Sequence, residues 1–321
     1  MKRATFCLAV ILATGAMVAS AATPNIVLGP DGTLYRLQAG SNSLSLTMER
    51  ADKNPQIVPV PQTSGIDAPY LLLDFDPATK TVVAAWQENP TENLSRIMLA
   101  TYHEGTWFGP VAVAGQSRLD AVHPSLLVHD TKLTETDDDG NVSVVGIESR
   151  IHLAWWEGLG TDDGGSAYYA SAVLDENGVP DMEDWVPVEM ETLVPWGSGC
   201  SLEEDASGLT FPRLFTDAQS GDPHLIFADL PNCMFGIVRL AEEPAGSGDG
   251  DPLVSQRRRN VIVFGLRKMV FIKPGLPLDN ANFEVGHDLS IALYWNTKDA
   301  VQYITLDNDS WSDIKSLKVG E

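Results

Sequence analysis

The chain is short of basic residues and of long apolar runs. It has 21 lysines and arginines against 44 aspartates and glutamates, for a net charge of −23. Such an acidic surface repels phosphate backbones and anionic lipid, which excludes nucleic acid as a partner. After the first 21 residues no stretch of about 18 apolar residues occurs, so we expect no membrane span.

Cysteine is scarce as well, with three in 321 residues. Cys7 lies in the apolar N-terminal stretch, which leaves Cys200 and Cys233. In an exported chain two cysteines are most simply one disulfide, and closing that loop would stabilise the fold by about 3–4 kcal/mol. A zinc pair lacks further clustered ligands, and a catalytic thiol lacks an evident partner. We therefore predict a Cys200–Cys233 disulfide.

The N-terminus, MKRATFCLAVILATGAMVASAA, has the pattern of a secretory signal peptide. Lys2 and Arg3 precede an apolar stretch, and Ala19-Ser20-Ala21 forms a small-residue cleavage site. The alternative is a buried N-terminal helix. We predict a signal peptide over residues 1–21 and a secreted or periplasmic protein comprising residues 22–321 as one domain.

Common catalytic motifs are missing. No G-x-S-x-G, H-E-x-x-H, P-loop or dinucleotide fingerprint occurs in a plausible setting, and no long amphipathic helix interrupts the β-like segments. The sequence therefore predicts an all-β architecture but does not indicate which reaction, if any, the protein catalyses.

Instead, the chain repeats itself. A proline followed by an apolar strand and an aspartate recurs, as in "APYLLLDFD" and "HPSLLVHD". A second apolar strand then ends in an aromatic residue, as in "VVAAWQEN" and "IHLAWWEG". This aromatic column contains Trp86, Trp155, Phe227 and Tyr294, separated by 69, 72 and 67 residues, with Tyr35 as a weaker first copy. Such regular spacing indicates a repeated structural unit.

A third strand and a tryptophan-led fourth complete each unit, and Gly/Asn/Asp turns join the four. This pattern predicts a β-propeller of about five, or six, four-stranded antiparallel blades. The blades should begin near residues 24, 67, 120, 205 and 253. The segment "RRRNVIVFGLRKMVFIK" fits blade four, blade five or a sixth blade. A β-sandwich is the competing fold, but it does not explain three elements recurring in one order.

These motifs resemble the blades of the sialidase-like (BNR-repeat) β-propeller superfamily. The family's Asp-box, S-x-D-x-G-x-T-W, is similar to "TYHEGTWF", in which His103 replaces the aspartate and Trp107 the threonine. The resemblance implies a propeller in which these boxes are structural turns. The family's F/Y-R-I-P segment and arginine triad have no counterpart here, so the resemblance does not extend to sialidase activity.

In such a propeller the ends of the second strands and the starts of the first strands open on one face. Polar residues at the second-strand ends are Glu88, Glu157, Asp229 and Asn296. Residues at or just before first strands are Asp67, His123 and Arg213, and both Cys200 and Cys233 fall on this face too. They predict a funnel that binds a cation or sugar hydroxyls, or that supplies an acid and a base. The alternative is that strands become polar where they meet solvent.

In "RIHLAWWEG" three adjacent residues receive different roles. Trp155 belongs to the aromatic column and should pack between blades. Trp156 points to the opposite side and is a candidate ligand contact. Glu157 lies at the loop-rich face and, with Glu88 and Asp229, is a candidate catalytic carboxylate.

The loop "ETDDDGN" offers half of a calcium site in Glu135, Asp137 and Asp139. The bidentate glutamate expected at the twelfth position of a calcium loop is replaced by Gly146, so an acidic hairpin loop is the favoured interpretation. We expect no cofactor, with structural calcium as the alternative.

The predicted function is an exported binding module that presents its loop-rich face to a glycan, peptide or protein, and that is a monomer. The alternative is a glycoside hydrolase with a sialidase-like fold, for which two of Glu88, Glu157 and Asp229 must lie roughly 5–10 Å apart.

Overall fold

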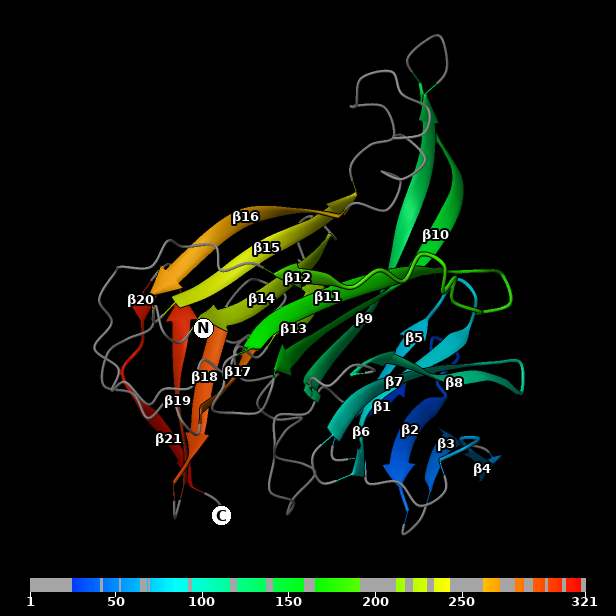
Figure 1. Cartoon of the computed structure of the whole chain (residues 1–321), viewed down its shortest axis with the longest axis horizontal. Helices are drawn as coiled ribbons and strands as arrows, with labels where there is room; N and C mark the ends of the chain where they lie inside the picture. The colour runs from blue at the N-terminus through cyan, green and yellow to red at the C-terminus, as the bar shows by residue number, and fades with distance from the viewer. Residues whose placement is uncertain are drawn as a thin grey trace.

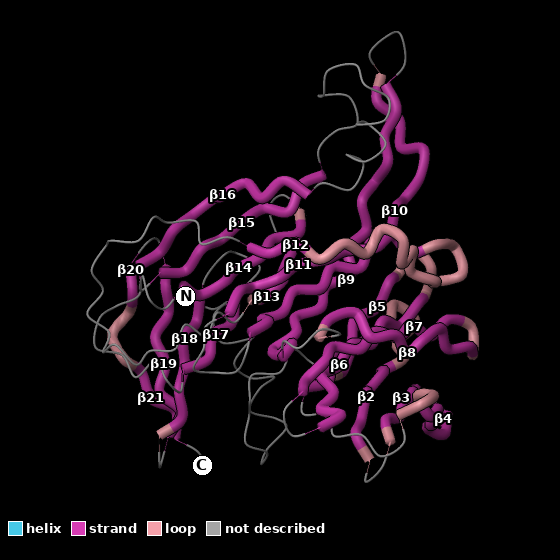
Figure 2. The backbone as a smooth tube through the Cα atoms, in the orientation of Figure 1, coloured by secondary structure: helices cyan, strands magenta, loops and turns pink. Residues whose placement is uncertain are grey.

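The computed structural model contains β-strands and no helix among the residues that it describes (Figure 2). The described residues are 25–40, 43–51, 53–63, 68, 70–91, 94–115, 120–136, 141–158, 165–190, 212–216, 222–229, 234–242, 262–271, 281–285, 291–297, 300–307 and 310–318. Consequently, none of their segments is a helix long and apolar enough to cross a membrane.

The strands form five antiparallel sheets, each built from consecutive segments of the chain. The first two sheets comprise β1 (Ile26–Leu28), β2 (Leu34–Ala39), β3 (Leu44–Arg50) and β4 (Lys53–Pro59), then β5 (Tyr70–Asp76), β6 (Thr81–Thr91), β7 (Leu94–His103) and β8 (Thr106–Ala114). The third comprises β9 (Asp120–Thr136), β10 (Val142–Gly158), β11 (Gly165–Leu174) and β12 (Val188–Met190). Among the described residues this confirms an all-β architecture of antiparallel sheets, four of which have four strands.

The fourth sheet comprises β13 (Arg213–Thr216), β14 (Pro223–Asp229), β15 (Met234–Glu242) and β16 (Ile262–Phe271). The fifth comprises β17 (Ala281–Val285), β18 (Ile291–Asn296), β19 (Ala300–Asp307), β20 (Ser310–Trp311) and β21 (Lys315–Lys318), where both β20 and β21 pair with β19. The segment "RRRNVIVFGLRKMVFIK", which the sequence allowed in blade four, blade five or a sixth blade, contains β16. This strand is the outer strand of the fourth sheet. The fifth sheet therefore begins at Ala281 and not near residue 253, because the apolar run pairs backward with β15.

The sheets follow one another in chain order, from the blue first sheet to the red fifth (Figure 1). Their first strands adjoin: β5 lies against β1 and β9, and β13 lies against β9 and β17. We call β1, β5, β9, β13 and β17 the inner strands. Because each sheet turns back on itself, the start of every inner strand lies beside the end of the second strand of its sheet.

Both faces of the middle sheets are buried, which explains why their second strands read as continuous apolar runs. Along β6, Val82, Ala84 and Trp86 pack against the first sheet, whereas Val83 and Ala85 pack against the third. Side chains alternate between faces along a strand, so neighbouring residues enter different cores.

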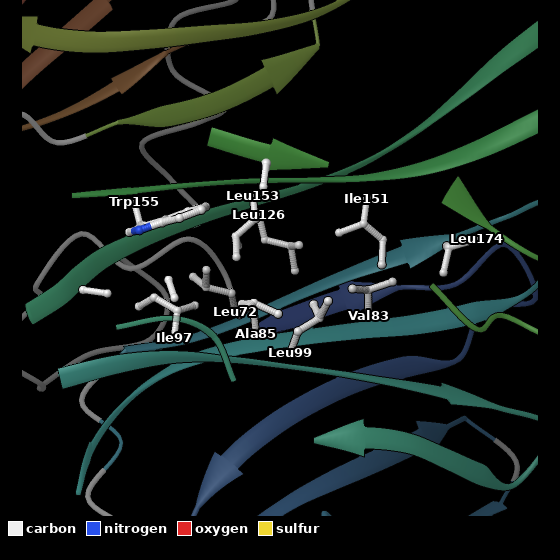
Figure 3. Packing of buried hydrophobic residues seen from close by; sticks show 14 residues of the cluster. Leu72, Val83, Ala85, Ile97, Leu99, Leu126, Ile151, Leu153, Trp155 and Leu174 are labelled. Carbon is white, nitrogen blue, oxygen red and sulfur yellow. The ribbon is translucent and has the colours of Figure 1, made fainter. Parts of the chain in front are cut away.

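A core of buried apolar side chains lies between the second and third sheets (Figure 3). Trp155 is fully buried there beside Leu72 and Ile97, and its ring stacks on Tyr168 with centroids 5.9 Å apart. Trp86 occupies the equivalent position in the preceding core. The prediction that the aromatic column is buried packing is confirmed for these two residues.

The β9–β10 hairpin extends beyond its sheet as a two-stranded ribbon (Figure 1). Val142 and Val144 on this ribbon are exposed. The acidic loop proposed for calcium falls at its tip: the backbone of Glu135 pairs with Ser143, and Asp137 and Asp139 lie outside the described residues.

Candidate ligand-binding site at the starts of the inner strands

The strand registers bring the predicted polar residues to one end of the sheets. Tyr70, the first residue of β5, pairs with Gln87, which directly precedes Glu88. In the third sheet Glu157 pairs with Ala121, two residues before His123. The first residue of β13 is Arg213, which follows Pro212.

His123 sits in a β-bulge at this end. Ser125 pairs with Ala154 and Val122 with Trp156, so His123 and Pro124 together oppose the single residue Trp155. The φ angle of His123 is +53°, in the left-handed region that non-glycine residues rarely adopt. Such a conformation costs on the order of 1–3 kcal/mol and is found preferentially at functional sites. The bulge re-aims the imidazole relative to the regular strand.

The His123 ring is fixed by its neighbours. Its centroid lies 5.1 Å from that of Tyr70 with the planes at 75°, an edge-to-face contact. The backbone N–H of His123 donates to Gln87 Oε1 at 3.3 Å, across the boundary between the second and third sheets. Two sheets therefore determine the position of this histidine.

The third sheet also contacts the fourth here. The N–H of Leu214 donates to Ser125 Oγ at 2.9 Å, which ties β13 to β9. Burial, together with the positive charge of Arg213, lowers the pKa of His123 to about 4. At neutral pH the imidazole is therefore uncharged, and Arg213 supplies the positive charge of the group. Arg213 is half-buried, and its Nη1 donates to the Pro212 carbonyl at 3.1 Å.

We call Tyr70, His123 and Arg213 the inner-strand cluster. They come from β5, β9 and β13, three successive inner strands. Tyr70 and Gln87 were not predicted from the sequence. The signal for Tyr70 was its position directly after a proline in the sequence, since Pro124 and Pro212 also occur near the starts of β9 and β13.

A polar network supports the cluster from the second sheet. The buried Gln87 donates through Nε2 to Asn89 Oδ1 at 3.1 Å, and the same oxygen accepts from Ser95 Oγ at 2.9 Å. The Ser95 N–H donates to Asp120 Oδ1 at 2.7 Å, at the start of β9. This network holds the amide that binds the His123 backbone.

The two described carboxylates of the predicted acidic column differ. Glu88 is buried and forms an ion pair with Arg96, with 3.0 Å between Oε1 and Nη2. Glu157 is half-buried and accepts from Trp155 Nε1 at 3.4 Å. Burial raises the pKa of Glu157, while the hydrogen bonds from Trp155 and from the Gly115 backbone oppose that rise. Glu88 is thus engaged with a cation, whereas Glu157 accepts from neutral N–H donors.

The other candidates fall in different places. Trp156 is only 3% exposed, so it packs in the interior and does not present its ring to solvent. Its Nε1 has no hydrogen-bond partner within the described part of the chain. Asp229 and Asn296 end β14 and β18, and the structure describes only their backbones. The predicted signal peptide, Asp67, Cys200 and Cys233 lie outside the described residues.

A second polar cluster, also missed, lies between the same two sheets at the opposite strand ends. Asp76 is fully buried, and its Oδ1 accepts from Ser149 Oγ at 3.1 Å; Ser149 Oγ also lies 2.8 Å from Asp130 Oδ1. Asp74 Oδ2 accepts from the Val128 N–H at 2.7 Å. Burial raises the pKa of Asp74 to about 6 and also raises that of Asp130. The repeated aspartates that end the inner-strand motif were the available signal.

Metal binding has no support in the described ranges. No group of three or more His, Cys, Asp or Glu side chains in them is arranged to hold an ion. The two carboxyl clusters are instead satisfied by hydroxyl, backbone and guanidinium donors.

No family model matches the sequence, and no curated protein matches it. Among solved structures, the fold is similar to xylan beta-1,4-xylosidase from Bacillus halodurans C-125, with 13% sequence identity and a TM-score of 0.38. The match covers 92% of this chain and 54% of that enzyme, so this chain spans about half of its length. At this TM-score the likeness says nothing about a reaction.

Proposed function

We propose that the five sheets close into a five-bladed propeller that is exported and acts as a ligand-binding module. Its binding site is the inner-strand cluster, and its ligand is a glycan or peptide that presents a carboxylate. The observation that carries this proposal is the convergence of Tyr70, His123 and Arg213 from three successive inner strands. Export by an N-terminal signal and a Cys200–Cys233 disulfide belong to the same proposal.

The chemistry of the cluster favours a carboxylate. A guanidinium offers a rigid fork of N–H donors that matches the two oxygens of a carboxylate. His123 is neutral because its pKa is about 4, so it can donate or accept one hydrogen bond without adding charge. The Tyr70 ring adds an apolar face. In a chain of net charge −23, a local arginine is needed to hold an anionic group at all.

Binding and catalysis are separated by screening wild-type protein on a glycan array and, in parallel, on a panel of chromogenic glycosides. For any acidic ligand found, calorimetry should show that Arg213→Ala weakens binding by about 10- to 100-fold, the value of a charged hydrogen bond. Arg50→Ala is the matched control, because Arg50 forms an exposed ion pair with Asp31 in the first sheet. Equal loss in both variants, or none in Arg213→Ala, contradicts the proposed site.

The raised pKa of Glu157 supports a second candidate function, glycoside hydrolysis with Glu157 as the general acid. A second carboxylate would then have to lie roughly 5–10 Å away. Release of chromophore by wild-type protein and its loss in Glu157→Gln would favour this function over binding alone. A panel without turnover would leave the binding function.

We also propose that the protein functions without a cofactor. Thermal unfolding in excess chelator tests this directly, since a structural calcium ion would raise the melting temperature only when bound. A lower melting temperature in chelator would show that a bound metal ion stabilises the fold and would contradict this proposal.

A further inference from the structure

A hollow of about 370 Å³ lies at the opposite strand ends from the inner-strand cluster. One wall is the β7–β8 turn with His103, Glu104 and Thr106, and the other is the turn at Asn177 in the third sheet. The aromatic residues Trp107 and Phe108 also line it. No function assigned above uses this hollow.

Hydrogen bonds hold the third-sheet wall in place. In the third-sheet turn, Asp175 Oδ1 accepts from the N–H groups of Asn177 and Val179 at 2.9 and 2.8 Å. The turn is docked on the second sheet, because the Gly178 carbonyl accepts from the buried Thr101 Oγ1 at 2.7 Å. The spacing between Asn177 and the β7–β8 turn is therefore set by contacts between the sheets.

A hydrogen-bonded chain orients His103. Its Nδ1 lies 3.2 Å from Thr81 Oγ1, which lies 2.7 Å from Thr79 Oγ1, and Thr79 in turn contacts the buried carboxylate of Asp76. Asp76 also accepts from the N–H groups of Ala78 and Thr79, which holds the carboxyl in place.

This chain engages Nδ1 of the imidazole, which leaves Nε2 as the ring nitrogen available to a ligand in the hollow.

The hollow is rich in polar groups that can accept hydrogen bonds. Besides the His103 imidazole, it offers the carboxylate of Glu104 and the amide oxygen of Asn177, and its lining residues include no lysine or arginine. A carboxylate and an amide oxygen complement a group that carries several N–H donors and a positive charge. Aromatic side chains complement an alkyl stem and attract a nearby cation.

We propose that this hollow binds a primary ammonium group on an alkyl chain, either a lysine side chain of a peptide or a free alkylamine. The ammonium hydrogens meet Glu104, His103 and Asn177, and the alkyl stem packs on Trp107 and Phe108. The strongly acidic surface of the protein concentrates cations around it and so favours the encounter. This site is independent of the inner-strand cluster, so the failure of one proposal leaves the other intact.

The test titrates ¹⁵N-labelled protein with n-butylammonium and with an acetylated, amidated lysine peptide. The readout is the indole N–H signal of Trp107, assigned by its loss in Trp107→Phe. Saturable shifts are expected below about 10 mM, the range of a few weak contacts. Tighter binding of the peptide identifies a protein ligand, and equal affinity identifies a free amine; either result supports the ammonium site.

The variants decide which groups matter. Glu104→Gln keeps the size of the side chain and should weaken binding by about 10- to 100-fold. Glu176→Gln is the matched control, because Glu176 is an exposed carboxylate beside Asn177 that does not line the hollow. His103→Phe keeps a ring without the acceptor and should also weaken binding.

Three outcomes overturn the proposal. They are the absence of a saturable shift with both ligands, equal shifts with the neutral isostere n-butanol, and unchanged affinity in Glu104→Gln. Melting temperatures of all variants are measured alongside, so that a loss of fold is not mistaken for a loss of binding.

Discussion

The buried carboxyl of Asp74 makes the packing of the second and third sheets depend on pH. Its Oδ2 accepts from Val128 across the sheets, and burial raises its pKa to about 6 from the usual 3.8. In the unfolded chain the carboxyl titrates near its usual value, so between about pH 4 and 6 only the folded state retains the proton. The protonated Asp74 carboxyl therefore stabilises the folded state at low pH, and this stabilisation is lost as the pH rises through 6. The whole effect is about 3 kcal/mol, of which about 1.4 kcal/mol is lost between pH 5 and pH 8.

Urea unfolding of wild type and Asp74→Asn at pH 5 and pH 8 measures this directly. The wild type should lose about 1.4 kcal/mol more than the variant over that interval. Because the change between pH 5 and pH 8 is compared in the two proteins, the pH-independent cost of replacing the carboxyl group by an amide cancels. The comparison also cancels the contribution of His152, which titrates in both proteins. Burial lowers the pKa of this histidine well below its usual value. The exposed Asp313→Asn should behave as wild type. Equal losses in wild type and Asp74→Asn would show that the carboxyl is already ionised at pH 5 and would refute the reasoning.

Three further predictions concern packing and covalent structure. Gly178→Ala should destabilise the fold by about 2–4 kcal/mol in chemical denaturation, because the added Cβ would lie 2.1 Å from a threonine oxygen. Gly32→Ala has a similar φ of +78° but open space around it, so it should cost only about 1 kcal/mol; equal costs would assign the whole effect to φ. Trp155→Ala should lower stability by about 3–5 kcal/mol, since the side chain is fully buried, and a loss below about 1 kcal/mol would contradict its place in the core. Cys200 and Cys233 should resist alkylation in the unfolded protein until a reductant is added, and mass spectrometry that finds both thiols free would disprove the disulfide.

The repeat made much of the fold predictable. Trp86 and Trp155 recur at the same strand position because each sheet must fill the space against the sheet before it. The apolar runs around them identify buried second strands. The assignment of β16 was not predictable, since an outer strand lacks the proline and aspartate that mark inner strands, and its apolar pattern fits any sheet edge.

The candidate site was predictable in position but not in chemistry. Strand order alone places Glu88, Glu157 and His123 at one end of the sheets. The ion pair of Glu88 depends on the β6–β7 register, which sets it opposite Arg96, and no sequence motif fixes that register. The same holds for Trp156, because polarity along a strand cannot tell a buried second face from an exposed one.

His123 shows why the chemistry of a side chain is harder to predict from the sequence than the order of the strands. Its left-handed backbone arises because two residues of β9 oppose one of β10, and a proline follows it at once. In a regular strand the direction of this side chain would follow the alternation of faces. The bulge instead turns it toward Tyr70 and the positive charge of Arg213. The charge state of the imidazole then follows from a residue 90 positions later in the chain. A repeat fixes which residues begin the inner strands, but the contacts between neighbouring sheets decide what those residues can bind. Relieving the bulge with His123→Gly would remove the ring and the strain together, whereas His123→Asn keeps a side chain that tolerates the left-handed region. If the cluster binds ligand through the imidazole, both variants lose affinity; if the histidine only shapes the bulge, the asparagine variant retains it.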